Sequence, residues 1–394
     1  MKAKFYKFMS IWGLIVCPIL SFPFILYGIY KQDKNSLYLM AFFLGIVAFL
    51  TPPVTDLYRH TLDYFYYQSL PWKNFIETID EDVITQIISY SFAHFGINYA
   101  FVRLVFVTIS LSIYFYIFYN LLLEKKISRK IYFILWIVLL AGYNYFELVL
   151  GVRYGLATAF FIGAFYFLYL KKKILKSLIF IMLSSFTHFF LFPISILMFL
   201  FYYIPISINK RCFLILSGIS LGIGFVLATS FILTYYNQQT AYIDGQYGVE
   251  YTSNVSFKGL IYYYLKRLWI IPLFYFFIRD KSNYTQMRNI IYILILMFIS
   301  VISLSVISGR IITIISILLI LYFLLNYKKQ DRYMFNIILL SSILFFSANI
   351  YTYRFVLGNN PYLGLCKPLI LLLDNDIYSK SWVYENINQD GFFK

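Results

Sequence analysis

Long apolar stretches alternate along the chain with short polar turns. Roughly twelve of them approach the ~20 residues that a helix needs to cross the apolar part of a bilayer. The first covers about residues 8–30, with kinks expected at Pro18 and Pro23, and the second about residues 37–54. Residues 174–208 are long enough for two spans joined at a turn near His188. The pattern predicts an all-α, polytopic membrane protein in which residues 1–394 form a single multi-span domain.

Composition supports this class. Hydrophobic residues make up 61% of the 394 residues, charged residues only 13%, and the mean hydropathy is +0.74. Such values exclude a soluble globular protein of ordinary make-up. The three cysteines show no spacing typical of a disulfide framework or a metal site. Gly218 and Gly222 form a small-xxx-small pair, which predicts close helix packing.

The basic residues that give the net charge of +16 cluster in alternate short loops from residue 124 onward. This positive-inside pattern places those loops in the cytoplasm and argues against nucleic acid as a partner. Three segments should then face outward: an acidic loop at 56–99 with an amphipathic segment at 83–99, a loop at 236–257, and a tail at 354–394. The basic N-terminus favours the inside, whereas counting spans back from Lys125 places it outside unless residues 83–99 also cross.

Residues 56–67, DLYRHTLDYFYY, form a polar stretch directly after the second span. In a helix, its two carboxylates, arginine and histidine are spaced to share one face: Asp56, Arg59, His60 and Asp63. One interpretation is a juxtamembrane helix with solvated charges and an interfacial belt of tyrosines. The other is that this face belongs to a functional site.

Further ionisable residues lie outside the basic loops, in positions that this topology places in or near the outer half of the bilayer. Together with the four above they are Arg103, Glu147, Arg153, His188, Lys266, Arg267, Arg310 and Arg354. Charge at such depth marks a functional site by default, and arginine binds phosphate with two parallel hydrogen bonds. The excess of arginine predicts an anionic ligand presented from the lipid, such as a lipid-linked pyrophosphate. The alternative for each arginine is a helix-end residue that reaches the interface.

Several short motifs occur in an order that resembles the EpsG family of polysaccharide polymerases, the Wzy-type enzymes. After the acidic and tyrosine-rich stretch come RYGLATAFFIGAFY (153–166), SSFTHFFLFPIS (184–195), SGRIITI, and a closing YR and NPY. The resemblance implies a glycosyltransferase that joins undecaprenyl-pyrophosphate-linked oligosaccharide repeat units at the outer face of the bacterial cytoplasmic membrane. It also implies a chain-length regulator protein as a partner. The chain departs from the family pattern in lacking a glycine before Asp56.

The resemblance also implies roles for residues. Arg153, Arg310 and Arg354 would hold the pyrophosphate, and Asp56 or His188 would take the proton from the acceptor hydroxyl. Further substrate contacts would come from Arg59, His60, Asp63, Glu147, Lys266 and Arg267. Because pyrophosphate is already a good leaving group, the reaction needs no cofactor or metal, although Asp56, His60 and Asp63 together have ligand types that suit a divalent ion.

Two other classes of protein share part of this pattern. A flippase for lipid-linked oligosaccharides would also bind pyrophosphate, but it should show internal repeats, which the sequence lacks. A membrane O-acyltransferase would need a catalytic histidine, for which His94 and His188 are candidates. Charge confined to one side favours the polymerase. The pattern holds no information on the sugar, the linkage, or whether the product is O-antigen, capsule or another exopolysaccharide.

Overall fold

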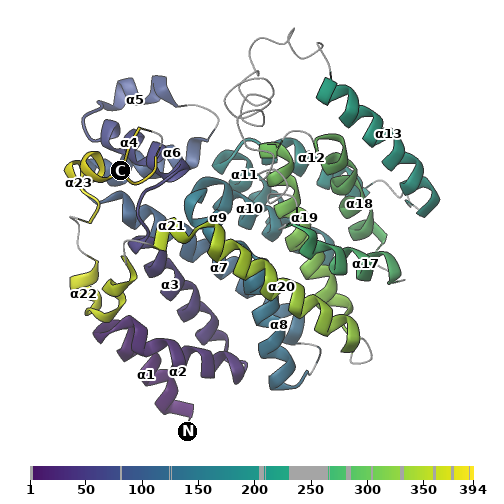
Figure 1. The fold of residues 1–394 in the computed structure, drawn as a ribbon, viewed down its shortest axis with the longest axis horizontal. Helices are drawn as coiled ribbons and strands as arrows, with labels where there is room; N and C mark the ends of the chain where they lie inside the picture. The colour runs from purple at the N-terminus through teal and green to yellow at the C-terminus, as the bar shows by residue number, and fades with distance from the viewer. Residues whose placement is uncertain are drawn as a thin grey trace. The chain divides into compact units, whose positions relative to one another are not determined.

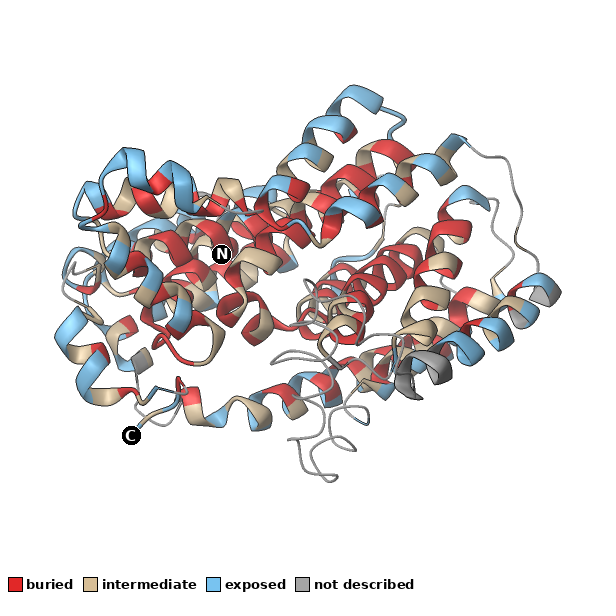
Figure 2. Cartoon of the chain, turned by 90° about the horizontal axis from the view of Figure 1, so that it is seen from above, coloured by how far each residue is buried: buried red, intermediate tan, exposed pale blue. Residues whose placement is uncertain are grey.

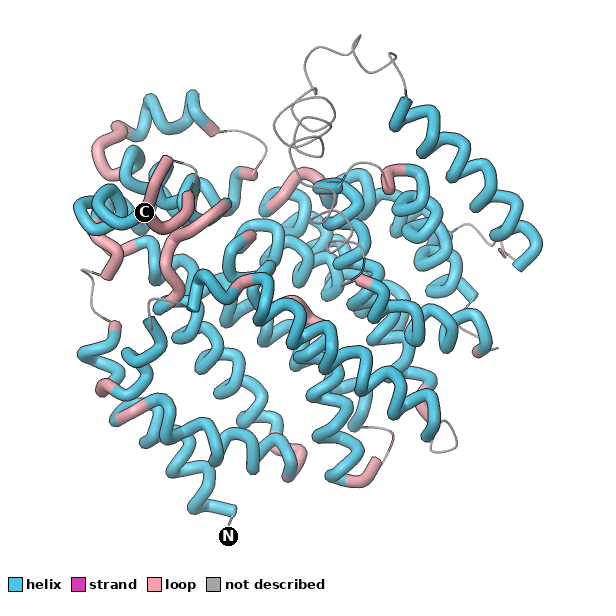
Figure 3. The backbone as a smooth tube through the Cα atoms, in the orientation of Figure 1, coloured by secondary structure: helices cyan, strands magenta, loops and turns pink. Residues whose placement is uncertain are grey.

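The computed structural model describes residues 3–79, 82–123, 125, 127–203, 208, 210–229, 265, 267–280, 285–302, 305–328, 332–357, 361–373, 377–389 and 391–394. Helices joined by short turns make up most of these residues (Figure 3). Within them, the sole β-type pairing is an isolated bridge between Ile387 and Phe393. The predicted all-α class is therefore confirmed for the part of the chain that the structure describes.

The chain forms two compact units. Unit 1 comprises Met1–Trp136, Asn144–Ser195 and Ile350–Lys394, and unit 2 comprises Ile137–Tyr143 and Ile196–Asn349. Three helices have residues in both units: α8 (Arg129–Gly142), α12 (Leu191–Tyr203) and α20 (Arg332–Thr352).

Unit 1 is built around α7, which packs against α3 on one side and α10 on the other, while α11 packs on α10 (Figure 1). The apolar faces of these helices meet in a core that includes Phe106, Phe115 and Phe161. The helices of the unit are α1 (Ala3–Val16), α2 (Pro18–Tyr30), α3 (Lys34–Leu50), α4 (Asp56–Tyr67), α5 (Trp72–Thr78), α6 (Val83–His94), α7 (Tyr99–Leu123), α9 (Tyr145–Leu150), α10 (Val152–Phe165), the π-helical η1 (Tyr166–Leu170), α11 (Ile174–Thr187), α21 (Arg354–Leu357), the 3-10 helix η5 (Pro361–Cys366), α22 (Leu369–Leu372) and α23 (Lys380–Asn386).

The first apolar stretch forms two helices, so the prediction of one kinked span over residues 8–30 is wrong. The backbone is extended at Cys17, and Pro18 begins α2 at a position where proline's missing N–H costs nothing. Ring contacts between Phe5 and Phe24 (6.2 Å) and between Tyr6 and Tyr27 (5.5 Å) show that α1 and α2 run antiparallel. At 1.5 Å per residue each helix is about 20 Å long, shorter than a ~30 Å hydrocarbon core.

Four helices among the described residues are long and apolar enough to cross a membrane: Tyr99–Leu123, Val152–Leu170, Val306–Asn326 and Arg332–Thr352. Seven shorter apolar helices accompany them. The predicted number of about twelve full spans is therefore not confirmed, because several apolar runs are broken into shorter helices. The run at 174–208 is one example, since α11 ends at Thr187 and α12 begins at Leu191, which confirms a break near His188.

Unit 2 has α19 (Ser305–Asn326) at its centre, in contact with α17 (Ile271–Arg279) and α18 (Thr285–Ser300). The remaining elements are α13 (Lys210–Thr229), which packs on α18, and the 3-10 helix η3 (Leu268–Ile270). A Cβ atom added at Gly218 or Gly222 would meet no described atom within 4 Å, so the described residues show no close packing at this pair. Close approach occurs instead at Gly45 of α3, where a Cβ would lie 2.1 Å from the Thr108 hydroxyl of α7.

Many large apolar side chains point away from the cores. Buried and exposed positions alternate along most helices (Figure 2), and the exposed set includes Phe8 on α1, Leu175 and Met182 on α11, and Ile215 on α13. In water such surfaces would be a liability, whereas in a bilayer they face acyl chains. The exposed apolar faces therefore agree with a membrane protein.

Candidate functional site

The polar stretch at 56–67 is helical, as the sequence predicts. Helix α4 buries Leu57, Tyr58, Thr61 and Tyr64, and it carries its charged residues on another face. The Tyr64 hydroxyl donates to the carbonyl of Ile97, which anchors α4 next to the start of α7. The charged face therefore has a fixed position in unit 1.

Helix α4 begins from a backbone turn that favours glycine. Thr55 has φ 57° and ψ −127°, a conformation that costs a β-branched residue roughly 1–3 kcal/mol. The family pattern that the sequence resembles has a glycine at this position. The Thr55 N–H donates to the carbonyl of Gly391 over 2.7 Å, so the C-terminal segment holds the turn.

The C-terminal segment, residues 377–389 and 391–394, lies near α4 within unit 1 (Figure 1). Asn98 donates to the carbonyl of Ile377 over 2.6 Å, and the Tyr378 hydroxyl donates to that of Leu50. The buried Arg103 guanidinium lies over the Tyr378 ring at 5.6 Å and donates to the carbonyls of Phe49 and Thr51. Arg103 thus satisfies the C-terminal end of α3, where a cation is favoured.

A histidine lies between two carboxylates on α4. His60 Nε2 is 3.4 Å from Asp56 Oδ2, and His60 Nδ1 is 3.7 Å from Asp63 Oδ2. Burial opposes the charged imidazole, but Asp56 and Asp63 outweigh it and raise the pKa of His60. Arg59 lies 2.6 Å from Asp56 Oδ1. Burial also opposes ionisation of Asp56, yet His60, Arg59 and Arg153 hold the pKa of Asp56 well below its usual range, which makes it a weak proton acceptor.

A second cluster joins three distant parts of the chain. Asp82, directly before α6, has Oδ2 3.0 Å from Arg153 Nη1 and Oδ1 3.1 Å from His188 Nδ1. The backbone N–H of Phe189 donates to the same Oδ1 over 3.1 Å. Burial alone would raise the pKa of Asp82, but His188, Arg153 and the Phe189 N–H together lower it. Two residues predicted to act in the site are therefore linked by a carboxylate.

Sequence reasoning missed Asp82. It follows two other acidic residues in a loop predicted to face outward and precedes a helix, so it has the signature of a solvated helix cap. The structure shows a residue only 6% exposed whose side chain makes no capping hydrogen bond to α6. Nothing in the local sequence distinguishes this carboxylate, because its partners lie on α10 and at the end of α11.

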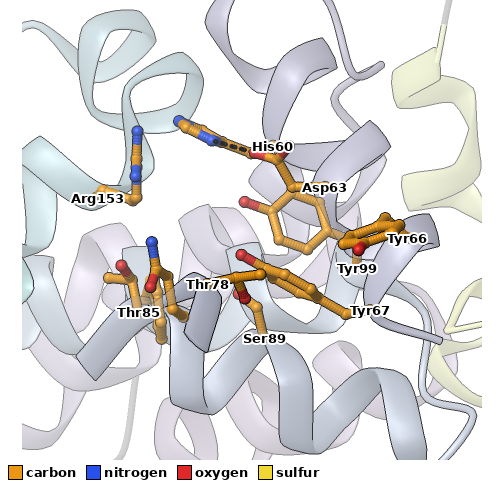
Figure 4. Close-up of a pocket in the computed structure, with 11 residues that line it drawn as sticks. His60, Asp63, Tyr66, Tyr67, Thr78, Thr85, Ser89, Tyr99 and Arg153 are labelled. Carbon is orange, nitrogen blue, oxygen red and sulfur yellow. Dashed lines mark ion pairs between the residues drawn. The ribbon is translucent and has the colours of Figure 1, made fainter. Parts of the chain in front are cut away.

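A pocket of about 340 Å³ lies between α4, α6 and the start of α10 (Figure 4). His60 and Asp63 stand on one side of it and Arg153 on the other. The rest of its lining is mostly hydroxyl, amide and phenol groups: Tyr66, Tyr67, Thr78, Thr85, Gln86, Ser89 and Tyr99, together with Phe106. The pocket therefore offers charges of both signs beside many neutral hydrogen-bonding groups.

The other predicted site residues lie elsewhere. Glu147 is on α9, and the exposed Arg354 begins α21, where its guanidinium lies 4.1 Å from the centre of the Tyr351 ring. Arg267 and Arg310 belong to unit 2. Lys266 is outside the described residues. The motif SGRIITI suggests a helix that starts at Arg310, but α19 begins at Ser305 and Arg310 is more than one turn further along.

Among the described residues, no group of three or more His, Cys, Asp or Glu side chains is arranged to hold a metal ion. Asp56, His60 and Asp63 form instead the chain of ion pairs described above. Their distances of 3.4 Å and 3.7 Å exceed those of a normal hydrogen bond.

Comparison with known proteins identifies the family. A model of the EpsG family matches residues 46–363, which include α4, Asp82, Arg153 and His188. No curated protein and no solved structure matches the chain. Since the match covers most of the chain and all of the pocket, the protein belongs to the EpsG family, which is associated with Wzy-type polysaccharide polymerases.

Proposed function

We propose that the protein is a glycosyltransferase that polymerises undecaprenyl-pyrophosphate-linked oligosaccharide repeat units at the outer face of the bacterial cytoplasmic membrane. The product is an O-antigen, a capsule or another exopolysaccharide. The observation that carries the proposal is the pocket of unit 1. In this pocket Arg153 lies opposite a histidine and a carboxylate, and hydroxyl and amide groups line much of the remaining wall. Membership of the EpsG family supports the reaction class.

The neutral wall of the pocket suits sugars. Sugar hydroxyls both donate and accept hydrogen bonds, as do the side chains of Thr85, Gln86 and Ser89. The phenol rings of Tyr66 and Tyr67 add flat apolar faces with a polar end. A volume of about 340 Å³ is at the small end for ligand pockets, so it fits a short part of a repeat unit.

The cationic side of the pocket suits a pyrophosphate. Arg153 is the second residue of α10, where unpaired backbone N–H groups and the helix dipole already favour an anion. Its side chain is 29% exposed, so phosphate oxygens can reach it beside Asp82. The carboxylates of Asp56 and Asp63 raise the pKa of His60 despite its burial, which favours the charged imidazole on this side of the pocket. Arg354, also in unit 1, is a further proposed contact to the pyrophosphate.

The reaction requires a base and a stabilised leaving group. An acceptor hydroxyl attacks the anomeric carbon of the donor chain, the bond from that carbon to the pyrophosphate oxygen breaks, and undecaprenyl pyrophosphate leaves with the electron pair. Arg153 and His60 stabilise the charge that develops on the leaving oxygen. The hydroxyl proton passes to a base, for which His188 is better suited than Asp56, whose pKa is lowered by its cationic neighbours.

Purified lipid-linked repeat units and purified protein test this proposal. The parent should convert single units into a ladder of longer chains. Arg153→Lys keeps the charge but loses the two parallel hydrogen bonds, so we expect a loss of roughly 10²-fold or more, and Arg153→Ala should lose nearly all activity. Arg129→Lys, at the exposed start of α8, is the matched control and should behave like the parent.

Two results would contradict the proposal. If the parent forms no polymer from any lipid-linked repeat unit of its own host, the reaction class is wrong. If Arg153→Lys elongates chains like the parent, Arg153 is not a phosphate ligand, and the pyrophosphate lies elsewhere, with Lys266 and Arg267 the next candidates.

A further inference from the structure

Asp82 is the most fully engaged carboxylate of the pocket region. Its two oxygens receive three donors: the Phe189 N–H and His188 Nδ1 at Oδ1, and Arg153 Nη1 at Oδ2. The side chains of Asp82 and His188 are only 9% and 11% exposed. A carboxylate buried to this degree is stable only when it is paired and hydrogen-bonded. The three contacts satisfy that need and fix two predicted site residues relative to each other.

The contact at Nδ1 determines the state of the other imidazole nitrogen. A carboxylate accepts hydrogen bonds, so Nδ1 must carry the proton when it lies 3.1 Å from Asp82 Oδ1. In the neutral ring, Nε2 then carries the lone pair that can take a proton. When Nε2 takes that proton, the negative charge of Asp82 stabilises the imidazolium that forms.

The remaining neighbours of His188 make this charge important. Helix α10 contributes Arg153 and Tyr154, whose ring meets the imidazole edge-on at 5.7 Å. Phe190 lies 6.4 Å away, and the basic residue of α11, Lys176, is at the opposite end of that helix. Helix α6 contributes Asp82 at its start and has His94 at its far end. Without Asp82, the nearest full charge to His188 among these groups would be the cation of Arg153.

We propose that Asp82 is a positioning residue that holds His188 in the tautomer able to act as the general base and holds Arg153 beside it for the pyrophosphate. This inference rests on the proposed polymerase function. It joins the two halves of the reaction through one carboxylate, since proton acceptance occurs on one side of Asp82 and binding of the leaving group on the other.

The titration of His188 tests this inference without any polymerase assay. The chain has three histidines, so His60→Gln and His94→Gln leave His188 alone. The pH dependence of its acylation by diethyl pyrocarbonate, followed by peptide mass spectrometry, gives its pKa. Asp82→Asn should lower that pKa by about one pH unit or more, because Arg153 stays and the negative charge is lost. Asp82→Glu keeps the charge and should titrate like the parent.

The control is Glu77→Gln, which removes an exposed carboxylate on α5 and should leave the titration unchanged. If Asp82→Asn titrates like Asp82→Glu, the inference is overturned. Loss of folding in the Asn variant would instead show as fast acylation with an ordinary histidine pKa. In that case the His188 titration is compared between the parent and Arg153→Gln, for which the inference requires a rise because Asp82 remains.

Activity then gives a second, separable measurement. In the parent background Asp82→Asn should reduce polymerisation by roughly 10²-fold. In a His188→Ala background the same change should cost less, because the part that acts through His188 is already lost and only the part that acts through Arg153 remains. Equal losses in both backgrounds would overturn the link to His188. A parent without polymerase activity would contradict the proposed function, and the titration would still decide the role of Asp82.

Discussion

Substituting Gly391 by alanine tests whether the C-terminal segment supports the start of α4. Gly391 has φ 80°, and a Cβ there would lie 3.1 Å from both the backbone N and the backbone O of Thr55. Gly96 is a matched control, because it has φ 65° and an added Cβ would meet no atom within 4 Å. In both alanine variants the left-handed backbone conformation lowers the free energy of unfolding by about 1–2 kcal/mol. Only Gly391→Ala also pushes against Thr55.

The difference between the two variants isolates the contact. To relieve the approach, the Gly391 backbone must move, which weakens the 2.7 Å hydrogen bond from the Thr55 N–H, worth about 1 kcal/mol. We therefore expect a loss of about 2–3 kcal/mol for Gly391→Ala against about 1–2 kcal/mol for Gly96→Ala. A difference of about 1 kcal/mol corresponds to a few degrees in the midpoint of thermal unfolding for a unit of this size.

Thermal unfolding in detergent measures the overall loss of stability. Limited proteolysis of a C-terminal tag measures how readily the C-terminal segment detaches from the start of α4. The tag should be released faster from Gly391→Ala than from Gly96→Ala. The polymerase activity of Gly391→Ala should also fall by a larger factor than the amount of protein in the membrane, because α4 carries His60 and Asp63. If the two variants release the tag equally fast, the segment does not hold the start of α4 and the reasoning fails.

Three further predictions follow from the structure. Because the pKa of His60 is raised, its ion pairs contribute stability that is fully present below pH ~6.5 and is lost as the pH rises through the folded-state pKa. The thermal midpoint of the parent should therefore exceed that of His60→Gln most at pH 5–6, and a constant gap up to pH 9 would contradict this. Thr55→Gly should raise the midpoint by the equivalent of about 1 kcal/mol, since relief of strain exceeds the added chain entropy; a lower midpoint would show that the threonine side chain is needed. Cysteines placed at Lys172 and Lys210 should be labelled from the cytoplasm and those at the exposed Lys73 and Glu385 from outside, and labelling of position 73 from inside would reverse the proposed location of the pocket.

Sequence patterns predicted those features that depend on neighbours in the chain. The charged face of α4 follows from helical spacing, and the break at His188 follows from a run too long for one helix. The hairpin of α1 and α2 was missed because a proline that kinks a helix and one that begins a new helix have the same local sequence.

The link through Asp82 depends on contacts far along the chain, so spacing holds no signal for it. Asp82 and His188 are separated by 106 positions, and a buried carboxylate cannot be told from a solvated one by its neighbours in the sequence. For Arg310 the local sequence was misleading. The small residues before it suggest that a helix starts there, but the structure places the start of α19 at Ser305.

The bond between Thr55 and Gly391 also bears on the order in which the protein is made. Residue 55 leaves the ribosome long before residue 391, so the turn at the start of α4 lacks this partner until residue 391 has been made. The start of α4 therefore gains this support only after residue 391 has been made. An incompletely synthesised chain would already contain Asp82, Arg153 and His188, but it would lack the contact that secures the helix carrying His60.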